Sequence, residues 1–146
     1  MKNNPKITRI KLETDHEKDY IFFGIVCHEP DYKLSLALNR KMNISLKSGS
    51  QLTISQDNDS SYSFSRFSDS PSSPDLIYDL LSNRNGKYYL IKKLKNIDYI
   101  FRIYDPDHLT NTVQIISLIR EIDCVSAVFK LIPEEIKDKN MQYITS

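Results

Sequence analysis

Two stretches of the chain are almost continuously apolar and rich in aromatic and β-branched residues. They cover residues 20–27 and 99–104. Such runs are typical of strands that are buried on both faces and therefore lie inside a sheet. Two further strands are predicted, one over residues 8–13, where apolar and charged residues alternate, and one over residues 125–131.

Two helices are predicted after turns that combine proline with acidic residues, because proline suits the first helical turn and an acid suits its positive end. These turns are Glu29-Pro30-Asp31 and Asp105-Pro106-Asp107. The first helix closes at Asn43. Its apolar stripe consists of Leu34, Ala37, Leu38 and Met42, and that of the second helix consists of Leu109, Val113, Ile116 and Ile119. A short polar helical turn is predicted over residues 134–140.

The middle of the chain has few large apolar side chains for packing, since serine occupies 12 of the 30 positions from residue 45 to residue 74. Strands are still predicted over residues 51–55 and 62–67. We expect mobile serine-rich loops near residues 56–61 and 68–75, which are rich in serine, aspartate and proline. Asn83-Arg84-Asn85-Gly86 then predicts a hairpin turn between strands at 75–82 and 87–94, because Asn-Gly tolerates positive φ angles.

A short repeat links the two ends of the chain. Asp19-Tyr20-Ile21-Phe22 recurs as Asp98-Tyr99-Ile100-Phe101, and each copy leads through an acidic proline turn into a predicted helix and a further strand. We therefore predict an α+β fold with a mainly antiparallel sheet, two strand–helix–strand units and both helices on one face. The second unit is similar in outline to parts of ferredoxin-like domains.

Length and charge favour one ordinary globular domain over residues 1–146. The 20 lysines and arginines nearly balance the 19 acids, so there is no general attraction to a polyanion, although a local basic patch can exist. Cys27 and Cys124 lie beside apolar residues and are expected to be buried, reduced thiols. No signal core or membrane-length apolar run is present, so we expect a cytoplasmic protein that does not span a membrane.

Metal-assisted hydrolysis is one chemistry that the residues could support. Nucleotide chemistry has less support, because the three glycines of the chain are not grouped into a phosphate-binding motif. His28 follows the first buried strand, and Asp105 and His108 follow the later one. If the two strands are neighbours, these side chains converge at one rim of the sheet and suit a divalent ion. The same convergence would bring Cys27 to His108. The alternative is that these are ordinary polar residues at helix starts and turns.

Aromatic residues concentrate between Tyr62 and Tyr104 and lie near several lysines and arginines. We predict a binding surface for single-stranded RNA or for a protein partner on this aromatic region of the sheet. Its residues are Tyr62, Phe64, Arg66, Tyr88 and Tyr89. Alternatively, the rings complete the core and the lysines protect an edge strand from aggregation.

A series of short segments runs along most of the chain. It consists of Phe23-Gly24-Ile25, Asp31-Tyr32-Lys33-Leu34, Leu38-Asn39, Leu81-Ser82-Asn83-Arg84 and Asn96-Ile97-Asp98-Tyr99-Ile100-Phe101. This series, over roughly residues 12–132, resembles the bacterial IPExxVDY family, which is named for its Ile-Pro-Glu-x-x-Val-Asp-Tyr signature. Ile97-Asp98-Tyr99 fits the end of that signature, whereas Lys92-Lys93-Leu94 stands where Ile-Pro-Glu is expected. The resemblance implies no activity, cofactor or catalytic residue, because the family is one of unknown function.

From the sequence we expect a non-enzymatic binding or adaptor domain that needs no cofactor and engages a protein or RNA partner. The sequence is also compatible with a homodimer. The alternatives are a small-molecule-sensing regulatory domain, with its ligand beneath Leu34 or Val113, and the metal-assisted hydrolase at His28, Asp105 and His108.

Overall fold

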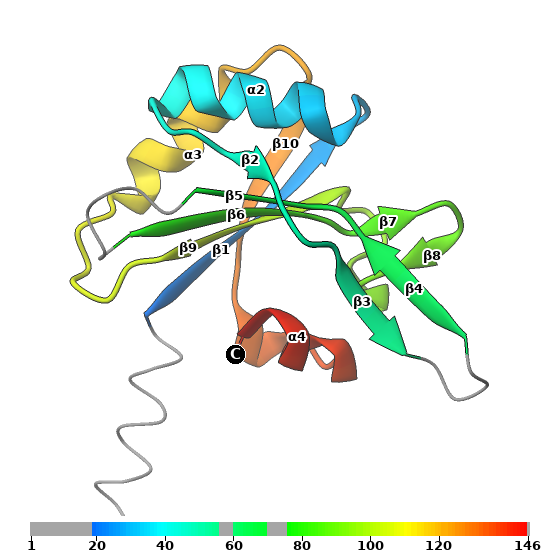
Figure 1. The fold of residues 1–146 in the computed structure, drawn as a ribbon. Coiled ribbons are helices and arrows are strands. Elements are labelled where there is room, and N and C mark those ends of the chain that lie inside the picture. Colours follow the sequence, from blue (N-terminus) through cyan, green and yellow to red (C-terminus); the bar gives the residue numbers. More distant parts are fainter. Residues whose placement is uncertain (1–18, 56–59, 70–75, 146) are drawn as a thin grey trace, which may run out of the picture.

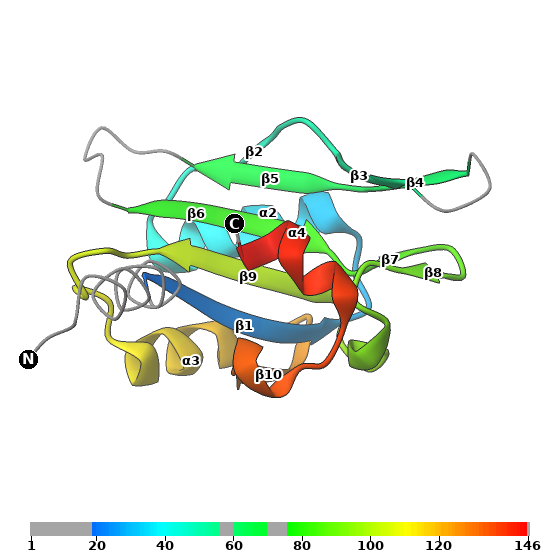
Figure 2. The ribbon, with the colours of Figure 1, turned by 90° about the horizontal axis from the view of Figure 1, so that it is seen from below.

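A six-stranded sheet forms the middle of the molecule in the computed structural model, which describes residues 19–55, 60–69 and 76–145. The strand order is β10-β1-β9-β6-β5-β2, and every pairing is antiparallel (Figure 2). The strands are β1 (Tyr20–Cys27), β2 (Lys47–Ser48), β5 (Arg66–Asp69), β6 (Ile77–Ser82), β9 (Tyr99–Tyr104) and β10 (Val125–Leu131). The two apolar runs of the sequence form strands β1 and β9, as predicted, and the structure places the two strands side by side.

Helices α2 (Asp31–Met42) and α3 (Thr112–Arg120) both cover one face of the sheet (Figure 1). The predicted α+β class with both helices on one face is therefore confirmed. Helix α2 follows Pro30 and ends at Asn43, which adopts the left-handed conformation with φ 57°. Helix α3 begins later than the sequence predicts, because Asn111 is its N-cap and the side-chain oxygen accepts the backbone N–H of Gln114.

Both predicted strand–helix–strand units exist. In the second unit, α3 carries the chain from β9 to β10, and β1 lies between these two strands. In the first unit, α2 carries the chain from β1 to the short β2 at the opposite edge of the sheet. The repeated Asp-Tyr-Ile-Phe segments thus start two neighbouring strands that run in opposite directions.

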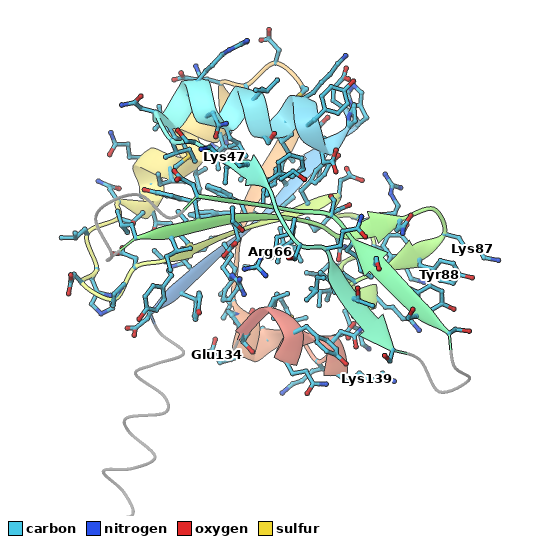
Figure 3. All side chains as sticks on the ribbon, in the orientation of Figure 1. Lys47, Arg66, Lys87, Tyr88, Glu134 and Lys139 are labelled. Carbon is cyan, nitrogen blue, oxygen red and sulfur yellow. The ribbon has the colours of Figure 1, made fainter. Side chains whose placement is uncertain are left out.

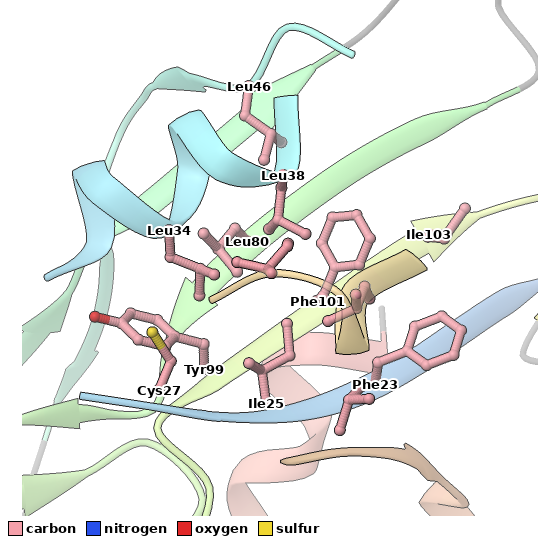
Figure 4. Close-up of a cluster of buried hydrophobic side chains, with 13 residues drawn as sticks. Phe23, Ile25, Cys27, Leu34, Leu38, Leu46, Leu80, Tyr99, Phe101 and Ile103 are labelled. Atoms are coloured by element: carbon pink, nitrogen blue, oxygen red, sulfur yellow. The ribbon is translucent and has the colours of Figure 1, made fainter. Parts of the chain in front are cut away.

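The sheet separates two apolar cores, because successive side chains of a strand point to opposite faces. The first core lies beneath the helices (Figure 4) and includes Phe23, Ile25, Leu34, Leu38, Phe101 and Ile119. The second lies on the other face and includes Phe22, Phe64, Leu81, Ile100 and Ile144. Its cover comes partly from the C-terminal elements η2 (Pro133–Glu135), η3 (Lys139–Met141) and α4 (Gln142–Thr145), visible below the sheet in Figure 1.

Two predictions about the middle of the chain are wrong. The single strand expected over residues 62–67 is divided at Ser65 into β4 (Ser61–Phe64) and β5. Strand β4 leaves the main sheet and pairs with β3 (Leu52–Ser55). The long hairpin expected around Asn83 is only β7 (Arg84–Asn85) with β8 (Tyr88–Tyr89), followed by the 3₁₀ turn η1 (Lys92–Leu94).

The predicted strand at residues 8–13 lies outside the described residues, and so do residues 56–59 and 70–75, which make up most of the two predicted mobile loops. Residues at the margins of those loops belong to strands: Ser61 begins β4, and Ser68 and Asp69 end β5. Strand β6 pairs with β5 and β9 instead of with residues 87–94.

Candidate binding cleft

Three tyrosines and three lysines line one cleft of about 390 Å³ beside the small β7–β8 hairpin. We call this the tyrosine–lysine cleft, and its residues are Tyr62, Lys87, Tyr88, Tyr89, Lys92 and Lys95. None of the described residues that line it is acidic. Figure 3 shows Lys87 and Tyr88 projecting from the molecule at the β7–β8 hairpin.

The hairpin is held against β4 by its turn. Gly86 has φ +61°, a conformation that glycine adopts at little cost, so the chain reverses directly after Asn85. The side-chain amide of Asn85 donates a hydrogen bond to the carbonyl of Ser63, 2.7 Å away. Strand β4 and the hairpin are therefore neighbours, which brings Tyr62 to Tyr88.

Asn83 fixes the base of the segment that carries the cleft. Its side chain is fully buried, accepts the N–H of Ile91 at 2.8 Å, and donates to the carbonyls of Leu94 and Ile97 at 2.9 Å each. Leu90 and Ile91 are also fully buried. The loop thus has a rigid base below and polar residues above, which suits a preformed site.

The rings of Tyr62 and Tyr88 are stacked, with centroids 3.9 Å apart and planes 27° apart. The ammonium of Lys87 lies 5.6 Å from the centroid of the Tyr88 ring, within the range of a cation–π contact. A hydrogen bond to the Tyr88 hydroxyl, followed by desolvation, raises the pKa of Tyr62, so the Tyr62 phenol is neutral at physiological pH. The cleft therefore combines flat aromatic surface with positive charge.

The structure brings together three of the five predicted surface residues, Tyr62, Tyr88 and Tyr89. The other two lie outside the cleft, and the prediction that Phe64 belongs to an exposed surface is wrong. Phe64 is 1% exposed and belongs to the second core, because it pairs with Leu52 and faces the sheet. Arg66 belongs to β5 and forms an ion pair with the buried Asp79 at 3.3 Å. The lysines of the cleft were visible in the sequence only as neighbours of the aromatic residues.

The predicted metal ligands do not converge. His28 follows β1 at the end where Ile25 pairs with Tyr99, whereas Asp105 and His108 lie beyond the other end, where Tyr20 pairs with Tyr104. These ends lie about 20 Å apart, at roughly 3.4 Å per residue. The two strands are neighbours, which was the condition for the predicted convergence, but the prediction is wrong because the pair is antiparallel and the two ends do not meet. Within the described residues, no group of three His, Cys, Asp or Glu side chains could hold a metal ion.

Asp105 instead organises the turn between β9 and α3. Its carboxylate accepts the backbone N–H groups of Leu109 at 3.0 Å and Thr110 at 2.7 Å. Burial opposes the charge, but these hydrogen bonds and the nearby His108 outweigh it and lower the pKa of Asp105 below its ordinary 3.8. His108 adopts a left-handed conformation with φ 55° and is exposed to solvent. The polar-turn interpretation therefore accounts for these residues.

A second, more open groove of about 640 Å³ lies between α2 and the turn that joins α3 to β10. Two of its lysines are already paired, Lys33 with Glu29 at 3.4 Å and Lys41 with Glu121 at 3.1 Å. Leu34 is fully buried and Val113 is 78% exposed, and neither lines this groove. The sequence predicted a ligand site beneath Leu34 or Val113, and this groove lies elsewhere.

No protein-family model matches this chain, and no curated protein matches it either. The resemblance to the IPExxVDY family stays a prediction from the sequence. In the part of the chain that the structure describes, no helix has the length and apolar character needed to span a membrane. The chain thus forms an α+β domain with a cleft that is lined by tyrosines and lysines.

Proposed function

We propose that this protein is a non-enzymatic binding module that captures single-stranded RNA in the tyrosine–lysine cleft. The observation that carries the proposal is the meeting of three tyrosines and three lysines in one cleft without an acidic lining residue among those described. Its volume of about 390 Å³ lies within the range of about 300–1,000 Å³ that ligand sites occupy, so the cleft is large enough for a nucleotide.

The aromatic surface of the cleft favours RNA over an acidic protein segment. Lysines attract both, but each base that stacks on an aromatic side chain adds about 1–3 kcal/mol, which an acidic segment without aromatic residues cannot gain. The stacked Tyr62–Tyr88 pair and the adjacent Tyr89 supply that surface. The net charge of the whole chain is only +1, so we expect modest affinity for RNA that depends on the lysines of the cleft. A cytoplasmic location accords with an RNA partner and stays a prediction.

The test is fluorescence anisotropy with a labelled single-stranded oligouridine RNA at several salt concentrations. With three lysines in contact with phosphates, log K should fall against log salt with a slope of about −2, at about 0.7 per phosphate on a single strand. Tyr88→Ala should weaken binding by about 1–3 kcal/mol, which is about 5- to 150-fold, whereas Tyr88→Phe should retain most of the affinity.

A matched charge control separates the cleft from general electrostatics. Lys92→Ala should weaken binding and reduce the salt slope by about 0.7, whereas Lys47→Ala, on the edge strand β2 outside the cleft, should change neither. Equal effects of the two lysine variants would refute the cleft as the site. Equal binding of a polyglutamate peptide would replace RNA by an acidic protein partner.

A further inference from the structure

The two cysteines of the chain, 97 residues apart in sequence, meet in the folded protein. The Sγ atoms of Cys27 and Cys124 lie 3.2 Å apart, and both thiols are free. Cys27 ends β1, which faces β10 there, and Cys124 immediately precedes β10, so the sheet itself holds the two residues together. A disulfide has an S–S distance of about 2.05 Å, so the sulfurs need to approach by only about 1 Å.

The two thiols differ in their surroundings. Cys27 is 2% exposed, whereas Cys124 is partly exposed and lines the groove between α2 and the turn after α3. Burial, followed by the hydrogen bond to Cys124, raises the pKa of Cys27 to about 12. Cys27 is therefore a poor nucleophile toward a reagent in solution, and the groove gives such a reagent access to Cys124 first.

We propose that Cys27 and Cys124 are a redox couple that hydroperoxides oxidise to an intramolecular disulfide and that dithiol reductants return to two thiols. The inference is independent of RNA binding, because neither cysteine belongs to the tyrosine–lysine cleft.

The chemistry proceeds in two balanced steps. The Cys124 sulfur attacks a peroxide oxygen, the S–O bond forms as the O–O bond breaks, and hydrogen peroxide leaves one water and a sulfenic acid. The Cys27 sulfur then attacks the Cys124 sulfur, the S–S bond forms as the S–O bond breaks, and the departing hydroxide takes the Cys27 proton as the second water. The two thiols lose two electrons in total, and the peroxide gains them. Close approach compensates for the low reactivity of Cys27.

The disulfide would join the end of β1 to the turn between α3 and β10 and would close a long loop through most of the chain. Cross-links over loops of this length constrain the unfolded chain strongly. We expect the thermal midpoint to rise by roughly 10 °C on oxidation and to return when a dithiol reductant is added.

The test treats the full chain with hydrogen peroxide, alkylates remaining thiols under denaturing conditions and maps peptides by mass spectrometry. Because the chain contains two cysteines, oxidation should reduce the alkylated thiols from two to none, with a cross-linked peptide pair and no covalent dimer. Unchanged thiols, a sulfinic acid at Cys124 beside a reduced Cys27, or a disulfide-linked dimer of the wild type would each overturn the proposal.

Two variants check the order of the steps. In Cys27→Ala, Cys124 should accumulate as a sulfenic acid that dimedone traps. In Cys124→Ser, Cys27 should stay reduced at the same peroxide dose, because it is buried. Faster oxidation of Cys27 in Cys124→Ser than of Cys124 in Cys27→Ala would contradict the proposed order. If one variant folds poorly, the peptide map of the wild type still decides whether the disulfide forms.

Discussion

Three buried polar residues organise the backbone where regular structure stops. Asn83 ties together the loop that carries the cleft, Asp105 forms the turn before α3, and Asp79 pairs with Arg102 on the sheet. Each is less than about a tenth exposed, and each satisfies neighbouring donors or acceptors. At such positions the loss of one hydrogen-bonding atom costs more than an average hydrogen bond contributes, because its partner stays buried without replacement.

Asp105→Asn tests the turn before α3. The substitution retains one acceptor oxygen but turns an amide toward a backbone N–H, so it should destabilise the protein by about 2 kcal/mol at neutral pH. The folded-state pKa of Asp105 lies below 3.8, so its charge stabilises the fold above that pH and the contribution is lost as pH falls toward the folded-state pKa. We therefore expect the difference in the free energy of unfolding between the wild type and Asp105→Asn, measured in urea, to be constant above about pH 5 and to become smaller below about pH 4. A difference that becomes larger in acid would contradict the assignment.

Asn83→Ala tests the base of the cleft. The change removes three buried hydrogen bonds of the side chain, to Ile91, Leu94 and Ile97. We expect a loss of about 3 kcal/mol in the free energy of unfolding and faster amide hydrogen exchange in residues 84–97. The exposed Asn85→Ala provides the comparison, since it removes one surface hydrogen bond and should cost less than about 1 kcal/mol. Equal costs would contradict a structural role for Asn83.

The C-terminal helix α4 is too short to be stable alone, because four residues form barely one turn. Its position depends on the buried Ile144 and on Arg102, whose guanidinium donates to the Ile144 carbonyl at 2.7 Å. The same guanidinium donates twice to Asp79 on the neighbouring strand, at 2.9 and 3.2 Å. Figure 2 shows α4 lying across β9, the strand that carries Arg102. One side chain thus links the sheet to the element that closes the second core.

Arg102→Met tests this link. Removing the cation leaves Asp79 buried beside fewer donors and frees the end of α4, so we expect a loss of about 3–5 kcal/mol in chemical denaturation. Amide exchange should accelerate in residues 141–145. The double variant Arg102→Met with Asp79→Leu should recover part of the loss, because it removes the uncompensated carboxylate as well. Strictly additive losses would show that the two residues do not act as a pair.

At the scale of the whole molecule, one sheet supports both cores. Leu80 and Leu81 are neighbours on β6, yet Leu80 belongs to the core beneath the helices and Leu81 to the core on the opposite face. The central strands β1 and β9 contribute to both cores in the same way. Because both cores pack on the same sheet, unfolding of the sheet exposes both of them to solvent. We therefore expect the two cores to unfold together.

Leu80→Ala and Leu81→Ala form a matched test, since the two side chains are 1% and 2% exposed. Each should cost about 2–5 kcal/mol, and each should shift one shared unfolding transition. The measurement is denaturation followed by both circular dichroism and tyrosine fluorescence. Separate transitions, with one variant affecting only the earlier and the other only the later, would show that the two faces fold independently.

Local sequence determined the elements whose signals are contained within a few residues. The apolar runs of β1 and β9 need burial on both faces wherever they lie, and Pro30 and Asn43 mark the ends of α2 by backbone preference alone. The sequence also located the tyrosines of the cleft. It missed the division at Ser65 and the shortness of the hairpin, because those depend on where the chain must leave one sheet for another.

Tertiary structure decided how strand ends and side chains meet. The antiparallel pairing of β1 with β9 separated His28 from Asp105, although the two strands are neighbours. The pairing of β1 with β10 brought Cys27 to Cys124 across 97 residues of sequence. Period and propensity act over a few residues and say which faces are buried, whereas strand direction and register are chosen by the packing of the whole sheet, so contacts between distant residues follow only from the fold.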